Sequence, residues 1–167
     1  MKANETGGKL DRLFDVYTES HQNRTNVLIH AICVPLISFG LIGLVWSIPF
    51  PHFDFMGSMN GFVNWASFLI AFIIYYYLKL SPTLSYGALF FIGLFSFLIV
   101  QLEYWEIAGG LRLWQSCLIA FVLGWAGQFV GHKIEGRKPS FLTDLKFLLI
   151  GPLWLLAKLY RLIRIPY

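Results

Sequence analysis

Three of the four histidines stand where polar sequence meets apolar sequence. His21 and His30 lie nine residues apart in SHQNRTNVLIHAICVP (residues 20–35), and His132 closes the apolar run that ends in GWAGQFVGH. Neutral imidazole is a common protein ligand for iron, zinc and copper. Three such rings could hold one divalent ion and leave coordination positions open for a substrate or for oxygen. We therefore predict a metal site built from these three histidines.

Four further polar side chains are candidates for the chemistry around such an ion. Asn26 and Gln128 each lie four residues before one of these histidines, and therefore on the same helical face as that histidine. Glu135 lies three residues after the last of them, where it would be a metal ligand or a hydrogen-bond partner of one. Asp144 begins the next apolar segment and could also reach the ion.

Each of these residues also has an ordinary structural interpretation. A histidine at a membrane surface often serves as an amphipathic anchor, Asn26 and Asp144 could cap helices, and Glu135 could simply face lipid headgroups. Polar side chains inside a membrane span usually face the protein interior, which favours a functional role for His30 and Gln128. The chain contains no HExxH, CxxC or Walker pattern. Spacing alone therefore supports a polar, metal-binding site without specifying its reaction.

The composition requires a membrane around these residues. The chain has 167 residues, of which 57% are apolar, 18% aromatic and only 13% charged, and its mean hydropathy is +0.63. Soluble domains carry about 25% charged residues, and a soluble protein of this size could not bury so much apolar surface. We expect a single membrane domain over residues 1–167. The basic residues flank apolar runs instead of sharing one face, so nucleic acid is not an expected partner.

Four apolar runs are long enough to cross a bilayer, which takes about 20 helical residues. They cover residues 27–48, 61–80, 82–102 and 110–132. The KLSP turn between the second and third runs predicts a tight antiparallel hairpin. The predicted fold is therefore an all-α polytopic membrane bundle, with its four transmembrane helices in residues 26–132.

Both ends of the chain are expected to lie outside the four spans. Residues 1–25 form a cytoplasmic segment whose amphipathic helix, at 10–21, should lie on the membrane surface and end at His21. Residues 133–167 indicate two interfacial or re-entrant pieces, broken at Gly151-Pro152. A fifth crossing in this last segment is the alternative.

Charge predicts the orientation of the bundle. With four crossings, every basic residue except Arg112 falls on the side that holds both termini. Because Lys and Arg favour the cytoplasmic side of membrane proteins, both termini are predicted to be cytoplasmic. The three candidate ligands then reach the same surface, whereas His52 lies on the opposite one and is excluded from the site.

A shared depth does not by itself bring the histidines together. Nine residues of continuous helix would turn His30 to nearly the opposite face from His21, at about 100° per residue. We expect QNRTN (residues 22–26) to break the helix, with Asn23 or Thr25 capping the next one. Small residues along one edge of the fourth span would let two helices approach closely, although packing could be their whole role: Ala120, Gly124, Gly127 and Gly131. Two polar stripes beside this edge predict a polar cavity between the first and fourth spans: Asn23, Asn26 and His30 on the first, and Trp125, Gln128 and His132 on the fourth.

Two stretches of the chain resemble the two signature regions of the membrane 2-hydroxy fatty acid dioxygenase family. They are HQNRTNVLIHAICVP and GWAGQFVGHKIEGRKPSFLTDL, the second followed by LLIGPLW. The resemblance implies Fe(II)- and O2-dependent removal of one carbon from a 2-hydroxy fatty acid, with release of CO2 and with histidines as the metal ligands. The positions that match the family pattern are His21, Asn26, His30, Pro35, Gln128, Gly131, His132, Pro139, Asp144 and Pro152.

The same resemblance implies partners and a location. The partners are a long-chain 2-hydroxy fatty acid, O2 and the lipid bilayer, with homo-oligomerisation left open. KIEGRKPS resembles the bacterial branch, which favours a bacterial inner membrane over the endoplasmic reticulum. Arg24 stands where the family often has proline, and Lys158 where an acidic residue is frequent. Rival functions are another metal-dependent lipid-modifying enzyme and a non-catalytic membrane scaffold.

Overall fold

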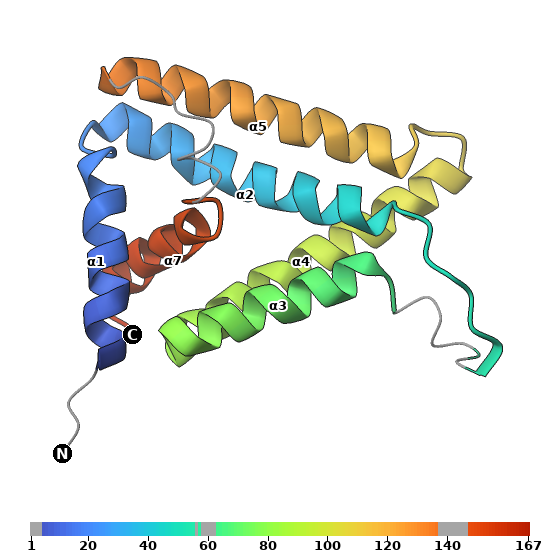
Figure 1. Cartoon of the computed structure of the whole chain (residues 1–167). Coiled ribbons are helices and arrows are strands. Elements are labelled where there is room, and N and C mark those ends of the chain that lie inside the picture. Colours follow the sequence, from blue (N-terminus) through green and yellow to red (C-terminus); the bar gives the residue numbers. More distant parts are fainter. Residues whose placement is uncertain (1–4, 56, 58–62, 137–146) are drawn as a thin grey trace.

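The computed structural model describes residues 5–55, 57, 63–136 and 147–167. These residues form helices joined by turns and loops, with no strand among them. The all-α class predicted from the sequence is therefore confirmed. The helices, labelled in Figure 1, are α1 (Glu5–Glu19), α2 (Arg24–Trp46), α3 (Trp65–Leu80), α4 (Pro82–Ile107), α5 (Leu113–Glu135) and α7 (Ile150–Leu162).

Three helices are long and apolar enough to cross a membrane. They are α2 and α5, with 23 residues each, and α4, with 26. The fourth expected span corresponds to α3, which is apolar but has only 16 residues, about 24 Å at 1.5 Å per residue. It begins at Trp65 and not near residue 61, because Asn64 caps it in a capping box with Ser67. Three crossings are thus supported in the described part of the chain, and the four-span count is not confirmed.

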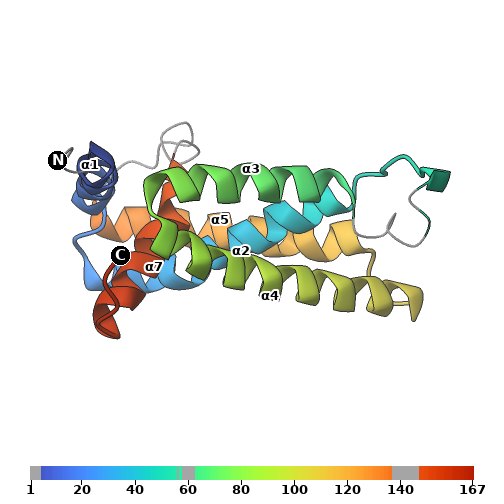
Figure 2. The same ribbon diagram turned by 90° about the horizontal axis from the view of Figure 1, so that it is seen from below.

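α3 and α4 form the antiparallel hairpin expected at the KLSP turn (Figure 1 and Figure 2). Ser81 ends α3, and its hydroxyl accepts a hydrogen bond from the Leu84 N–H at 3.2 Å, which caps α4. Pro82 takes the first position of α4, where a helix needs no N–H donor. One serine therefore closes one helix and opens the next.

α2 and α5 run side by side and make the most extensive contact between the helices above. Glycines on α5 allow this approach. A Cβ at Gly124 would lie 2.6 Å from Ile37 Cγ1 and 3.1 Å from the Cys33 carbonyl oxygen. A Cβ at Gly127 would collide with Cys33 Sγ. The close-packing edge predicted for the last span is confirmed.

Protein covers the apolar face of α1. Phe14 and Tyr17 are buried, and the Tyr17 ring lies 5.0 Å from the ring of Trp154 in α7. The sequence analysis expected this helix to lie on the membrane surface, whereas the structure packs it on α7 and α3. The helix also ends at Glu19, so His21 lies beyond it and does not end it. An amphipathic pattern shows which face is apolar, but not whether lipid or protein covers that face.

α7 begins at Ile150, directly after a turn at residues 148–149, so the Gly151-Pro152 pair, where a break was predicted, lies in its first turn. Pro152 is the third residue of the helix, and an N–H at that position has no partner within a helix, so proline is tolerated. The helix has 13 residues, well below the about 20 needed to cross a bilayer. It packs on α1, α2 and α4. The described C-terminal residues therefore form no fifth crossing.

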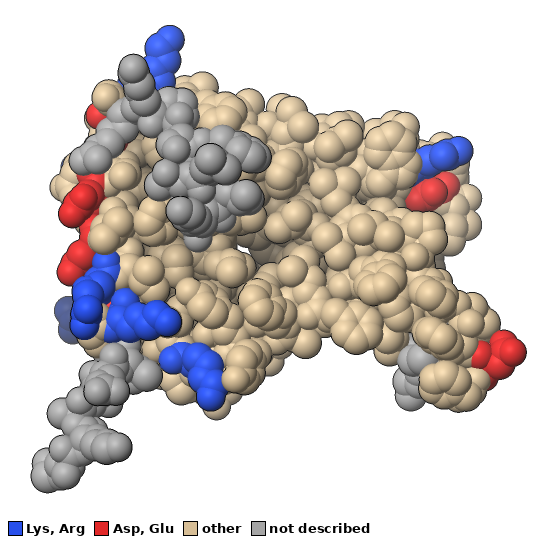
Figure 3. All heavy atoms as spheres, viewed as in Figure 1, with Lys and Arg blue, Asp and Glu red and all other residues tan. Residues whose placement is uncertain are grey.

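The two short helices lie together at one end of the bundle. Figure 1 and Figure 2 show α1 and α7 beside the start of α2 and the end of α5, with the α2–α3 and α4–α5 connections at the opposite end. In Figure 3, most Lys and Arg side chains of the visible face gather at the α1–α7 end, and the middle of this face is almost free of charge. The charge asymmetry agrees with the orientation argument, and the cytoplasmic assignment stays a prediction.

Replacing Gly124 by leucine should destabilise the protein by roughly 1–3 kcal/mol, because overpacking a close helix contact forces side chains and backbone to shift. Gly93 of α4 supplies the matched control, since a Cβ there meets nothing within 4 Å and Gly93→Leu gains helix propensity. Denaturant unfolding of the two variants in one detergent would compare them. Equal stability of both would contradict the packing role of Gly124.

Candidate metal centre

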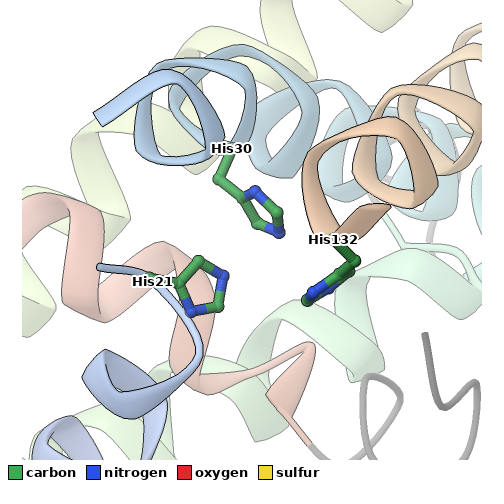
Figure 4. A group of neighbouring side chains, drawn as sticks. All are labelled: His21, His30 and His132. Carbon is green, nitrogen blue, oxygen red and sulfur yellow. The ribbon is translucent and has the colours of Figure 1, made fainter. Parts of the chain in front are cut away.

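Three histidine rings from distant parts of the chain meet at the α1–α7 end of the bundle (Figure 4). The ring centroids are 4.3 Å apart for His21 and His30, 5.0 Å for His30 and His132, and 5.7 Å for His21 and His132. Each ring offers one nitrogen, and these three atoms lie within 4.8 Å of one another. Nitrogens bonded to one ion at about 2.1 Å lie up to about 4.2 Å apart. Small movements of the three side chains would therefore bring the nitrogens to the spacing that a single metal ion requires.

Helix ends place the three rings. His30 lies in the second turn of α2, and His132 lies in the last turn of α5. His21 lies in the turn between α1 and α2, where the predicted helix break occurs. Asn23 caps α2, and its Oδ1 accepts a hydrogen bond from the Thr25 N–H at 2.8 Å. Because the helix is interrupted, the first two rings lie against each other instead of on opposite faces.

Backbone carbonyls fix the tautomer of two of the rings. His21 Nδ1 lies 2.7 Å from the Tyr17 carbonyl oxygen, and His30 Nδ1 lies 3.0 Å from that of Asn26. A carbonyl can only accept, so Nδ1 carries the proton and Nε2 keeps its lone pair. Both Nε2 atoms are buried and have no hydrogen-bond partner among residues that the structure describes. Histidines that bind metals commonly donate their second ring N–H to a backbone carbonyl in this way.

The three rings are withdrawn from water. His21 and His132 are 5% exposed, and His30 is 1% exposed. Burial lowers the pKa of His21 to about 4, against the smaller opposing effect of its hydrogen bond to the Tyr17 carbonyl. At neutral pH this imidazole is therefore uncharged, which is the form that binds a metal ion.

Two aromatic rings hold His21 in place. Tyr17 stacks on it, with the centroids 4.1 Å apart and the planes 8° apart. Trp154 lies 5.3 Å away, and its Nε1 donates a hydrogen bond to Thr18 Oγ1 at 2.9 Å. The sequence analysis gave neither Tyr17 nor Trp154 a role at the site. The i, i+4 spacing of Tyr17 and His21 was a usable signal, whereas no spacing rule links Trp154 to α1.

A cavity of about 50 Å³ adjoins the rings. Its polar lining includes the three histidines, Ser20 and Gln128, and its apolar lining includes Val34, Phe147 and Leu148. One water molecule takes about 30 Å³ in the liquid. The cavity therefore has room for one or two small molecules or for the polar head of a ligand, but not for an acyl chain.

The other predicted site residues lie in different surroundings. Gln128 is buried and lines the cavity, whereas Asn26 is buried and does not line it. Glu135 accepts hydrogen bonds from the turn before α2 and is not among the grouped ligand atoms. Asp144 lies outside the described residues. The side chain of His52, which was excluded from the site, is 71% exposed in the connection after α2.

Removing any one of the three rings should lower the affinity for a divalent metal by more than about 100-fold, because even the outer partners of metal ligands contribute about 10–100-fold. Titration of His21→Ala, His30→Ala and His132→Ala with Co(II) would measure the loss. His52→Ala serves as the control, because its ring lies in another part of the fold. A variant among the three that kept wild-type affinity would remove its ring from the ligand set.

Comparison with known proteins agrees with the resemblance found in the sequence. The family model Mpo1-like, described as 2-hydroxy-palmitic acid dioxygenase Mpo1-like, matches residues 8–163. This range contains all three histidines and most of every helix named above. No curated protein and no solved structure matches the chain. Because the match covers most of the sequence, the protein belongs to the 2-hydroxy-palmitic acid dioxygenase Mpo1-like family.

Proposed function

We propose that this protein is an Fe(II)- and O2-dependent dioxygenase that shortens 2-hydroxy fatty acids by one carbon. The balanced reaction is R–CH(OH)–COOH + O2 → R–COOH + CO2 + H2O. The bond between the carboxyl carbon and the hydroxyl-bearing carbon breaks, and O2 takes up the four electrons released. The substrate supplies all of these electrons, so the reaction consumes no separate reductant. Family membership supports this activity.

One observation carries the proposal. The Nε2 atoms of His21 and His30 are buried, without hydrogen-bond partners in the described structure, and belong to a group completed by His132. A buried nitrogen with an unused lone pair is unfavourable, and a divalent cation between the rings would relieve that cost. Three neutral ligands would also leave the full charge of the ion available to attract a carboxylate. Imidazole suits iron, and non-haem Fe(II) sites with open positions serve oxygenases.

The residues of the site would then have distinct roles. The three histidines would hold Fe(II), which when bound supplies the redox chemistry that activates O2. Gln128 lines the cavity and would hydrogen-bond to the hydroxyl or carboxylate of the substrate. The stacked Tyr17 ring would restrict His21 and keep water from that side of the ion.

The size of the cavity would divide the substrate into a head and a tail. A space of about 50 Å³ accommodates the hydroxy acid head beside the histidines. Val34 and Leu148, which also line the cavity, would contact the first carbons of the chain. The rest of the chain would lie outside the cavity, among the apolar helices and the lipid.

We further propose that the apolar helix α3 makes a fourth crossing, so that both termini lie on one side, that this side is cytoplasmic and that the membrane is a bacterial inner membrane. Three long apolar helices support insertion in a bilayer. The basic side chains gather at the end that carries the histidines, as expected for a cytoplasmic end. A site at this depth would let an acid head meet the ion while its tail stays in hydrocarbon.

A second candidate function keeps the metal and changes the chemistry. Three neutral imidazoles also form zinc sites that activate water, so the same group would suit a zinc-dependent lipid hydrolase. A non-catalytic scaffold, in contrast, gives no reason for ring nitrogens to be buried without partners. Oxygen dependence separates the two enzymes.

Purified protein loaded with Fe(II) should convert 2-hydroxypalmitic acid in air to pentadecanoic acid, with one CO2 released per O2 consumed. The conversion should stop without oxygen, because O2 is the oxidant. It should also stop in His132→Ala, because this variant lacks a metal ligand. Product analysis and an oxygen electrode would measure both. Hydrolysis of an ester or amide bond of a lipid by zinc-loaded protein in the absence of oxygen would support the hydrolase instead. Folded wild-type protein that binds no metal and converts no 2-hydroxy acid would refute the proposal.

A further inference from the structure

Asn26 contacts the surroundings of all three histidines. Its backbone carbonyl accepts a hydrogen bond from His30 Nδ1 at 3.0 Å. Its side-chain Nδ2 donates to the carbonyl oxygen of Ser20, the residue before the first of the three, at 3.1 Å. The same Nδ2 donates to Oε2 of Glu135, which lies one helical turn beyond the last of the three, at 2.8 Å. Asn26 is 0% exposed and does not line the cavity, so these hydrogen bonds, and not contact with a ligand in the cavity, connect it to the site.

Glu135 directs its whole carboxylate at the turn between α1 and α2. Its Oε1 accepts hydrogen bonds from the backbone N–H groups of Gln22 at 2.9 Å and Asn23 at 3.1 Å. Its Oε2 accepts from the Asn23 N–H at 3.0 Å and from the Asn26 amide. Backbone N–H groups just before a helix need acceptors outside that helix, and a negative charge at a helix N-terminus is favourable. The carboxylate therefore fastens the end of α5 to the start of α2.

Gly131 provides the space for this network. A Cβ at this position of α5 would collide with Asn26 Oδ1 and would lie 3.2 Å from His30 Cε1. A larger residue would push Asn26 away from Glu135. The hydrogen bonds around Asn26 therefore depend on the close contact between α2 and α5.

We propose that Asn26 and Glu135 are positioning residues that form a clasp between the turn before α2 and the end of α5. The clasp sets the relative positions of the three metal-binding rings, an inference that rests on the proposed function for the identity of those ligands. His21 belongs to the turn and His132 to α5, so loss of the clasp would let the two rings drift apart. Neither clasp residue is assigned contact with the ion or the substrate.

The pairing of amide and carboxylate can be reversed with little change in side-chain shape. Asn26→Asp would set two carboxylates against each other. Glu135→Gln would turn a donor NH2 toward either the Asn26 amide or the backbone N–H groups. The double variant would pair a carboxylate with an amide again. Each single change should lower Co(II) affinity about 10–100-fold, as expected for outer partners of metal ligands, and the double variant should bind more tightly than either single variant.

The visible absorption spectrum of bound Co(II) supplies a readout that general destabilisation would not change, because it reports the geometry of the ligands. The single variants should show altered spectra, and the double variant should return toward the wild-type spectrum. Glu103→Gln is the matched control: Glu103 also accepts a side-chain hydrogen bond, from Trp46 Nε1 at 3.1 Å, but lies in the far half of α4. Its spectrum and affinity should equal those of the wild type.

Hydrogen exchange of metal-free protein tests the clasp without the ion. The amides of Gln22 and Asn23 should exchange faster in Glu135→Gln than in the wild type, because their acceptor is weakened. Unchanged exchange and unchanged Co(II) spectra in both single variants would overturn the clasp, even if the wild type is an active dioxygenase. Conversely, a wild type that binds no metal would remove the proposed function and leave the exchange result to decide the clasp. If one single variant does not fold, a double variant that binds Co(II) like the wild type supports the clasp, and unchanged Gln22 and Asn23 exchange together with an unchanged Co(II) spectrum in the single variant that folds overturns it.

Discussion

The burial of imidazole nitrogens with unused lone pairs is the constraint on which this end of the protein depends. His21 and His30 each place Nδ1 against the carbonyl of the residue four positions earlier, which leaves Nε2 facing the other rings. In a low-dielectric interior, polar atoms without partners are unfavourable. The packing of the surrounding helices must supply the free energy that holds them there. A cation bound only by the folded state would add to stability by mass action, so ion binding and the order of this end would be linked.

The helical architecture could be predicted because hydropathy and the residues that begin or end helices are local signals. Apolar runs located α2, α4 and α5, and Ser81 with Pro82 marked the hairpin that follows α3. What could not be predicted depended on what each face meets. The apolar face of α1 is the same whether lipid or Trp154 covers it. Gly151-Pro152 has the same sequence whether it breaks a helix or forms its first turn, and only the position of the helix start distinguishes the two.

The candidate site, like the fold, could be predicted only in part. Topology brought the three histidines to one level, and the helix break after His21 made a shared site geometrically feasible. The residues that position these rings could not be predicted, because the hydrogen bond from Asn26 to Glu135 joins residues 109 positions apart in the sequence. Spacing relative to His132 suggested that Glu135 was a metal ligand or a hydrogen-bond partner of one, whereas its carboxylate accepts hydrogen bonds from the turn before α2 and from Asn26. Sequence patterns identify polar side chains well and their acceptors poorly.

The dimensions of the site bear on substrate selection in the proposed reaction. A cavity of about 50 Å³ can discriminate between substrates by their head group, in which a hydroxyl and a carboxylate lie on adjacent carbons. It is too small to discriminate between them by chain length. A buried polar site discriminates strongly against a ligand that leaves its groups unpaired, whereas each methylene of a chain contributes only about 0.8 kcal/mol on transfer from water. Long 2-hydroxy acids would therefore be selected mainly by their partition into the bilayer beside α2 and α5, and the hydroxyl group by the site. Chain-length preference would then follow membrane concentration more closely than it follows any residue of the cavity.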